Sequence, residues 1–345
     1  MELRKAQEMG GGTILISLPK DWVEHYGLKK GSIIAIDTTA DGCLLIYPFK
    51  SEEKRMREMN IPYPSEDLER LIDKITGAYL LGCDVIKICG NKRINYKDRE
   101  RIKKGVQRLI GLEIVEEDAY SITLQFLPEP ATLNPTKMFV RMHMLVMGMI
   151  KDAITSLIER DEHLAKVVIE RDDEVDRIYF LLVRMLRSAV LNHKLANTYG
   201  LSAVDCLDYR VAATILEAEG DAAVELVQNI SIISKDLSKE FNDRLLKVGL
   251  ALEESQKLAV KAFLSKEEKD SKKAEEANRN LYEILESLKI EFSQKPLPSL
   301  LTIISNVDKM YRCNVDISDL AVPIYPLVNK TTIEEFTNKS KNHFN

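Results

Sequence analysis

The chain has 345 residues, of which 45% are hydrophobic and 30% charged, and its net charge is −5. This length exceeds one ordinary core and predicts two or three domains, while the composition is that of a soluble globular protein. A negative net charge excludes a global positive field that would draw the whole molecule onto nucleic acid. Any nucleic-acid contact must therefore come from a local patch.

The cysteine pattern and the apolar runs exclude two further classes. The cysteines form no C-x-x-C pair and no His/Cys cluster, which argues against a zinc ribbon or a redox motif: they are Cys43, Cys83, Cys89, Cys206 and Cys313. We expect them to be reduced core residues of a cytosolic protein. The N-terminus lacks an apolar signal core, and the strongest apolar run, 144–150, is much shorter than a membrane span. The sequence predicts a cytoplasmic chain without membrane insertion.

Residues 1–49 have the pattern of a small β-rich unit. The β-branched stretch 13–18 (TILISL) predicts a strand. Pro19 suits the first turn of a short helix. Two more strands are expected at 32–39 and 43–48, joined by an Asp-Gly turn. The predicted order is strand, short helix, two strands.

Residues 50–130 predict a small α/β domain. Their first part, 50–67, is charged and punctuated by proline, which indicates a linker helix at a domain boundary. Helical and strand patterns follow: helices around 68–75 and 102–110, and strands at 84–89, 112–117 and 120–127. No glycine-rich phosphate loop and no catalytic set is visible among them.

Residues 131–325 predict an antiparallel helical bundle. Apolar residues recur at spacings of three and four, with charged residues on the opposite faces: examples are Ile178, Leu182, Met185, Leu207, Val211 and Ile215. The last segment, 326–345, is polar and is expected to be a loosely ordered tail. The predicted fold class is thus a multidomain α+β protein.

Three motifs in the N-terminal unit resemble the SpoVT-AbrB family of archaeal type: SLPKDW, YGLKKG and ADGCLLI. The resemblance covers nearly all of 11–48. It implies a β-barrel that two chains share by swapping hairpins, and therefore a homodimer. A unit of fewer than 50 residues buries too little apolar surface alone, which is a physical reason for dimerisation.

The same resemblance implies DNA binding by basic residues near the first strand and the turn, which would neutralise phosphates and contact a groove: Arg4, Lys5, Lys20, Lys29 and Lys30. The first 50 residues hold six Lys and Arg and six Asp and Glu, so the unit is not basic overall. A unit that only dimerises remains the alternative, because lysines on turns are usually solvated surface.

Two acidic motifs mark the helical region. Asp172 with Asp176, and Glu217 with Asp221, each follow the pattern E/D-x-x-x-D, in which positions i and i+4 share one helix face. With the helices of about 135–322 they resemble the PhoU family, whose fold is two copies of a three-helix unit. Two packed faces would place four carboxylates around one point, which suits a hard or borderline cation. The candidate cofactor is a divalent or iron-type metal ion, and the alternative is a pair of solvated helix faces.

A weak internal repeat aligns 308–318 with 217–227 and places Arg312 where Asp221 stands in the first copy. A guanidinium repels a metal and has no lone pair. We expect Arg312 to form an ion pair with Asp308 or Asp316, and any metal to bind in the first copy only.

The remaining motifs favour packing over chemistry. Five methionines between positions 138 and 149, and His143 among them, are interpreted as packing residues. No Ser-His-Asp or Cys-His arrangement is present, so an enzyme is not expected.

The two resemblances together imply a phosphate-uptake regulator that binds DNA and couples phosphate status to transcription or to a Pst-type phosphate ABC transporter. The alternative is a dimeric adaptor that binds no DNA and docks on the transporter ATPase.

Overall fold

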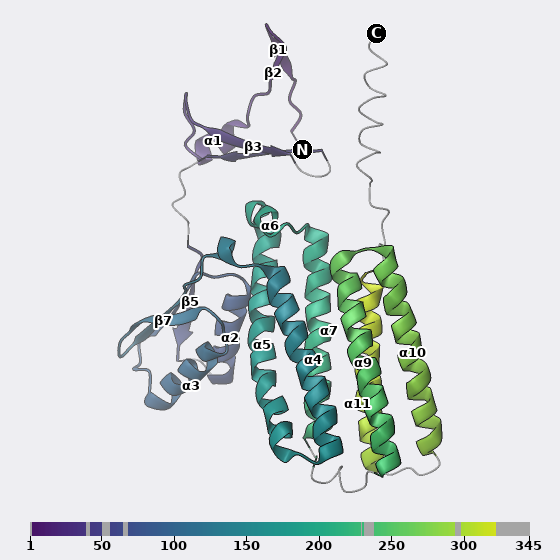
Figure 1. The fold of residues 1–345 in the computed structure, drawn as a ribbon. Coiled ribbons are helices and arrows are strands. Elements are labelled where there is room, and N and C mark those ends of the chain that lie inside the picture. Colours follow the sequence, from purple (N-terminus) through teal and green to yellow (C-terminus); the bar gives the residue numbers. More distant parts are fainter. Residues whose placement is uncertain are drawn as a thin grey trace, which may run out of the picture. The chain divides into compact units, whose positions relative to one another are not determined.

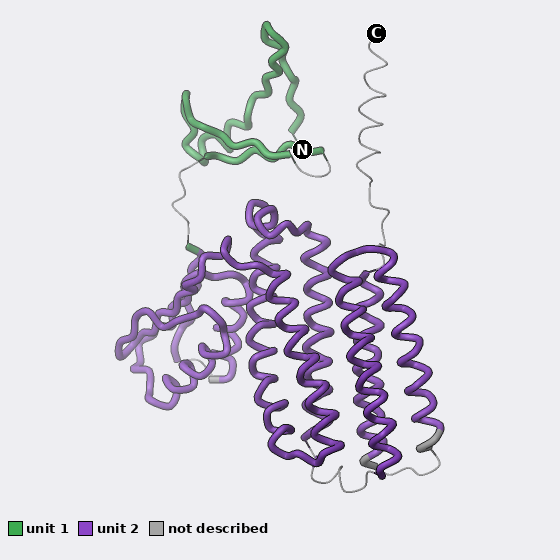
Figure 2. Tube along the Cα trace, in the orientation of Figure 1, with its two compact units in different colours: residues 1–56 green, residues 57–345 purple. Residues whose placement is uncertain are grey.

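A computed structural model of the chain describes residues 2–38, 42–49, 56–64, 68–228, 230, 238–293 and 298–321. The chain divides into two compact units, residues 1–56 and 57–345 (Figure 2). The predicted polar tail, residues 50–55 and 65–67 of the predicted linker, and Asp41 of the predicted hairpin turn lie outside the described residues.

The N-terminal unit consists of two separate hairpins and one short helix (Figure 1). Strand β1 (Gln7–Met9) pairs antiparallel with β2 (Thr13–Leu15), and β3 (Ile34–Thr38) with β4 (Leu44–Pro48). Helix α1 (Lys20–His25) follows β2 in the chain. The predicted strand order is present, with β1 as an additional strand that the sequence did not indicate. In the single chain the two sheets do not close into a barrel.

None of the described residues of this unit is buried. Large apolar side chains on its strands are exposed to solvent: Met9 by 56%, Ile14 by 58%, Ile36 by 63% and Leu44 by 62%. The unit therefore has no hydrophobic core of its own among the described residues.

The second unit begins with an α/β part built on a four-stranded mixed sheet of order β5-β6-β8-β7. Its strands are β5 (Glu58–Tyr63), β6 (Val85–Gly90), β7 (Leu112–Glu117) and β8 (Ser121–Phe126). Helix α2 (Leu68–Leu80) connects the parallel pair β5 and β6, and α3 (Tyr96–Gln107) leads into the antiparallel hairpin β7-β8. Strands and helices were expected in this region, and both are present.

The predicted linker helix is wrong where β5 forms. Pro62 cannot donate a ladder hydrogen bond, and it is tolerated because β5 lies at the sheet edge. Ile61 and Tyr63 on this strand are buried, so β5 contributes to the core. At the end of the neighbouring strand, a Cβ on Gly90 would lie 1.7 Å from the Tyr63 carbonyl oxygen, so the close approach there requires glycine.

The remaining described part of the second unit is helical, as the periodicity predicted. Figure 1 shows the long helices running side by side; they are α4 (Pro135–Glu159), α5 (Glu162–Leu191), α7 (Ala203–Val227), α9 (Lys239–Ser265), α10 (Glu268–Ser293) and α11 (Pro298–Asp319). The short α6 (His193–Tyr199) joins α5 to α7, and the 3-10 turn η1 (Pro130–Thr132) precedes α4. A capping box between Ser202 and Asp205 begins α7. No helix within the described ranges combines the length and the apolarity needed to cross a membrane.

Arg184 on α5 joins the bundle to the α/β part. Its side chain is 3% exposed, and its Nη1 donates to the carbonyl oxygens of Tyr79 (2.6 Å) and Cys83 (2.9 Å). The guanidinium carbon lies 3.8 Å from the centroid of the Phe126 ring. One buried side chain therefore satisfies the backbone at the end of α2 and stacks on the sheet.

Two packing expectations need correction. Cys83, Cys206 and Cys313 are buried, but Cys43 and Cys89 are exposed, because Cys43 lies in a unit without a core and Cys89 near the end of β6. Met144 is 67% exposed, although Met142 and Met149 on the same helix are buried.

His143 on α4 is buried, as expected, but its Nδ1 has no partner among the described residues. Burial lowers the pKa of His143 to about 4, so the ring is neutral.

Candidate functional site: an acidic cluster on helices α5 and α7

Helices α5 and α7 bring the four carboxylates of the acidic motifs within electrostatic reach of one another. Burial raises the pKa of Asp172 to about 6, and the negative charges of Asp176 and Asp221 add to the effect. Burial also raises the pKa of Glu217, again reinforced by Asp221, Asp176 and Asp172. Each helix places its pair one turn apart on a common face. We call these four residues the acidic cluster.

The surroundings of the acidic cluster are partly apolar and partly charged. A Cβ on Gly220 would lie 3.7 Å from side-chain carbons of Met149 and Val146 and 3.9 Å from Asp172 Oδ1. Burial raises the pKa of Asp221, although the positive charge of Lys309 opposes the shift. The cluster thus lies where α7 approaches α4 and α5, with a cation of α11 nearby.

Arg108, at the end of α3 in the α/β part, supplies a counter-ion to this cluster. Its Nη2 lies 2.7 Å from Asp176 Oδ2, and the two side chains are 57% and 22% exposed. Its charge also opposes the raised pKa of Asp172. A residue outside the helical bundle therefore neutralises part of the negative charge on the bundle.

The described residues contain no group of three or more His, Cys, Asp or Glu side chains arranged to hold a metal ion. The charges of the four carboxylates in the acidic cluster influence one another, but the carboxylates do not converge as a ligand set. One of them, Asp176, is also paired with Arg108. The arrangement does not fit a bound metal ion as it stands, and we derive no chemical step through one.

The equivalent place in the second repeat is an ion-pair network. Arg312 Nε lies 2.9 Å from Asp308 Oδ2, and Lys289 Nζ lies 2.6 Å from Asp308 Oδ1. Burial favours the neutral form of Asp308, but the hydrogen bond and charge of Lys289, with Arg312, lower its pKa overall. The expected pairing of Arg312 with Asp308 is confirmed.

Replacing Arg108 with alanine is expected to raise the pKa of Asp172 above about 6, because the only cation that lowers it among its principal influences is removed. The pKa of Asp172 is measured by following the chemical shift of its carboxyl carbon by NMR as the pH is varied. Arg101→Ala on the same helix is the control, since Arg101 is exposed and is not among the principal charges that act on Asp172. An unchanged Asp172 titration in Arg108→Ala would contradict the influence of the Arg108 charge on Asp172.

Glu219, which the sequence patterns did not indicate as a candidate, is fully buried on α7 and lies outside the acidic cluster. Its Oε2 accepts a hydrogen bond of 2.6 Å from Gln256 Nε2 of α9, and its Oε1 has no partner among the described residues. Burial raises its pKa to about 8. A signal was available, because position 219 follows Leu216 and precedes Ala223 at core spacings of three and four.

The basic residues proposed for DNA binding all lie in the N-terminal unit. Arg4 donates to Ser17 Oγ (3.1 Å) and pairs with Glu2, and Lys20 lies 3.7 Å from Glu24. Lys5, Lys29 and Lys30 are exposed. All five side chains are cations without acceptor atoms, so no hydrogen bond or ion pair can join one side chain to another. Their binding of DNA stays a prediction.

Comparison with known proteins identifies the region that holds the acidic cluster. Residues 139–230 match the family model described as the PhoU domain. Over 94 residues the chain is 35% identical to the phosphate-specific transport system accessory protein PhoU homolog of Aquifex aeolicus (strain VF5), covering 26% of this chain and 42% of that protein. The chain thus spans less than half the length of this curated relative.

Two solved structures are also similar. The crystal structure of PhoU from Pseudomonas aeruginosa covers 54% of this chain and 93% of its own, with 17% identity and a TM-score of 0.47. That of the phosphate transport system regulatory protein PhoU from Streptococcus pneumoniae covers 54% and 91%, with 14% identity and a TM-score of 0.45. The acidic cluster thus lies in a segment, residues 139–230, that is similar in sequence to PhoU domains.

Proposed function

We propose that the chain is a cytoplasmic regulator of phosphate transport. The observation that carries the proposal is the PhoU-domain match over 139–230, which contains all four residues of the acidic cluster. The curated relative is, by its name, an accessory protein of a phosphate-specific transport system. The acidic cluster with its Arg108 counter-ion is the proposed point of regulation. A divalent or iron-type metal ion at Asp172, Asp176, Glu217 and Asp221 is part of the proposal. Its binding requires the four carboxylates to move into a converging ligand set and Arg108 to release Asp176.

The finer proposal is that residues 1–49 form an AbrB-like barrel of archaeal type shared between two chains. It is supported by the exposed apolar strands of this unit, none of whose described residues is buried. A second copy would cover these side chains and remove the free edges of the two hairpins. The proposed domain order is this barrel, an α/β domain over 50–130, a PhoU-like bundle over 131–325 and a polar tail.

The parent is expected to be dimeric and the variant Ile36→Glu monomeric, and light scattering measures both. Ile36 lies on β3 with 63% of its surface exposed, so a charge there is harmless in one chain but costly inside a shared barrel. Val211→Glu, at an exposed apolar position of α7, is the matched control and should stay dimeric. A monomeric parent, or a dimeric Ile36→Glu, would place the interface elsewhere.

The regulator would act on DNA through Arg4, Lys5, Lys20, Lys29 and Lys30, which lie in the unit proposed to dimerise. The alternative is an adaptor that only dimerises and docks on the ATPase of a Pst-type transporter, and the equal numbers of acidic and basic residues in the first 50 positions favour it. Genomic footprinting in phosphate-replete and phosphate-starved cells separates the two. Enriched sites that depend on phosphate support the DNA-binding regulator, and their absence in both conditions leaves the adaptor.

A further inference from the structure

Helix α3 of the α/β part presents a line of positive charge to solvent. Residues 92–108 contain eight Lys and Arg and two Asp and Glu, a net charge of +6 in a chain whose total is −5. Lys97, Arg101 and Lys104 are exposed and recur at spacings of four and three, and Arg108 follows after four more. Residues at these spacings share one face of a helix. We call these four residues the basic stripe.

The packing of α3 fixes the direction in which the basic stripe points. Ile102 and Val106 are buried in the α/β core, on the side of the helix opposite the stripe. At the start of the helix, the Asn95 side chain accepts a hydrogen bond of 2.9 Å from the Asp98 backbone N–H. An anchored and capped helix therefore carries the basic stripe on the side away from the core of its own domain.

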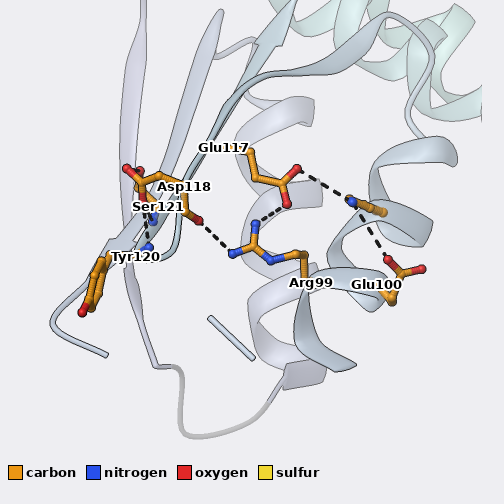
Figure 3. Close-up of polar contacts among 7 residues, drawn as sticks. Arg99, Glu100, Glu117, Asp118, Tyr120 and Ser121 are labelled. Atoms are coloured by element: carbon orange, nitrogen blue, oxygen red, sulfur yellow. Dashed lines mark hydrogen bonds and ion pairs between the residues drawn. The ribbon is translucent and has the colours of Figure 1, made fainter. Parts of the chain in front are cut away.

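Neighbouring acidic residues are engaged by other cations of α3. Figure 3 shows Arg99 turned towards β7 and the loop after it, where it pairs with Glu117 and donates to the Asp118 carbonyl oxygen at 2.8 Å. Lys103 lies 3.8 Å from Glu117 and 3.9 Å from Glu100. Arg99 and Lys103 thus neutralise Glu117 and Glu100, and neither residue belongs to the basic stripe.

The members of the basic stripe differ in how far they are neutralised. Within the described part of the chain, Lys97, Arg101 and Lys104 form no ion pair. Arg108 alone is paired, with Asp176 of the acidic cluster. Three uncompensated cations therefore form the solvent-facing part of the stripe.

We infer that the three unpaired cations of the basic stripe, Lys97, Arg101 and Lys104, bind the phosphodiester backbone of duplex DNA. With a helical rise of about 1.5 Å per residue, they lie about 4.5–6 Å apart along the axis and together span about 10 Å. A DNA strand offers one phosphate per about 3.4 Å of helix axis, so a line of cations faces a line of anions. Lys and Arg clustered along one helix are the electrostatic footprint of nucleic-acid binding. The contact would position DNA without reading its sequence.

The solvent-exposed side of α3 lacks the apolar surface that insertion into a membrane requires. The apolar residues Ile102 and Val106 are buried in the domain, and Tyr96, at 75% exposure, is the large apolar-bodied side chain that α3 shows to solvent. A membrane-surface helix needs an apolar face that enters the lipid boundary. The inference rests on the DNA-binding part of the proposed function and gives the α/β part a role in it.

The test is fluorescence anisotropy of the full-length chain with a labelled duplex of unrelated sequence, at salt concentrations from 50 to about 200 mM. In the triple variant Lys97→Ala, Arg101→Ala, Lys104→Ala, three lost contacts should flatten the slope of log affinity against log salt by about 2.7. Affinity near 0.1 M salt should fall about 10- to 100-fold. The loss should be equal for duplexes of different sequence.

A matched control removes the same charges elsewhere. Lys257→Ala, Lys273→Ala, Arg279→Ala also takes two lysines and one arginine from exposed positions, on α9 and α10, and should bind like the parent. Thermal melting followed by circular dichroism should show both triple variants folded, since all six side chains are exposed. If the control loses affinity as much as the stripe variant does, only net charge matters and the inference is overturned.

A second variant separates this inference from the proposed N-terminal contacts. If Arg4→Ala with Lys5→Ala abolishes binding while the stripe variant binds like the parent, the stripe is overturned and the N-terminal proposal stands. A parent that binds no duplex at 50 mM salt overturns both. If the parent binds vesicles of phosphatidylserine through the stripe but not the duplex, the ligand is a membrane surface and the DNA assignment is overturned.

Discussion

Replacing Arg184 with alanine is expected to lower the free energy of unfolding by about 3–5 kcal/mol. The guanidinium donates to two carbonyl oxygens, of Tyr79 and Cys83, at a position where its own side chain is 3% exposed. A buried acceptor without a partner costs about 1–3 kcal/mol. The truncation also leaves a cavity beside the Phe126 ring, on which the guanidinium stacks.

Denaturant unfolding of Arg184→Ala and of Arg184→Met measures the loss in the free energy of unfolding and separates its packing part from its hydrogen-bond part. Methionine keeps most of the apolar stem, so its advantage over alanine reports packing, and its deficit against the parent reports the lost hydrogen bonds. Arg187→Ala, an exposed arginine on the same helix, should change stability by less than about 0.5 kcal/mol. Equal stability of Arg184→Ala and Arg187→Ala would show that the two parts of the second unit do not depend on this contact.

Replacing Glu219 with glutamine is expected to remove a large pH dependence of stability. The pKa of Glu219 is raised by burial from its ordinary 4.5 to about 8, so the folded chain holds a proton that the unfolded chain releases. This contribution to stability is complete below about pH 4.5, declines by about 1.4 kcal/mol per pH unit as pH rises, and is lost above about 8. Glutamine is neutral throughout, and its amide offers N–H donors at the place where Glu219 Oε1 has no partner.

Chemical denaturation at several pH values between 6 and 8.5 tests this expectation. The difference in stability between Glu219→Gln and the parent should grow with pH and level off above about 8. Asp172 titrates near pH 6 in both proteins, so the difference isolates Glu219. Glu254→Gln, an exposed position on α9, is the control and should follow the parent. A pH-independent difference for Glu219→Gln would mean that Glu219 is ionised in the folded chain.

The helical part of the fold could be predicted because its helices are amphipathic and several of them are capped by local signals. The apolar spacing around Ile178 and Leu182 corresponds to buried positions on α5, and Ser202 begins α7 with a capping box. Strand β5 could not be recognised, because Asn60 and Pro62 interrupt the β-branched pattern that usually marks a strand. Tertiary packing on β6 decides its structure.

In the candidate site, too, features set by local sequence spacing could be predicted, whereas contacts made through tertiary packing could not. The i, i+4 spacing of Asp172 with Asp176 was visible in the sequence, and so was the replacement of Asp221 by Arg312 in the second copy. The counter-ion could not be predicted, because Arg108 lies 68 residues from Asp176 and reaches it only through the packing of the α/β part. Glu219 is not expected in a core on residue type alone, because charged side chains usually face solvent, although its spacing places it there.

The central claim is that this chain makes phosphate transport respond to phosphate supply, and both the DNA-binding regulator and the adaptor share it. The most direct test is uptake of radiolabelled phosphate in cells that lack the chain, grown with abundant and with scarce phosphate. Uptake should no longer change between the two conditions as it does in parent cells, and expressing the full chain should restore the response. Uptake that depends on phosphate supply to the same extent with and without the chain would contradict the claim.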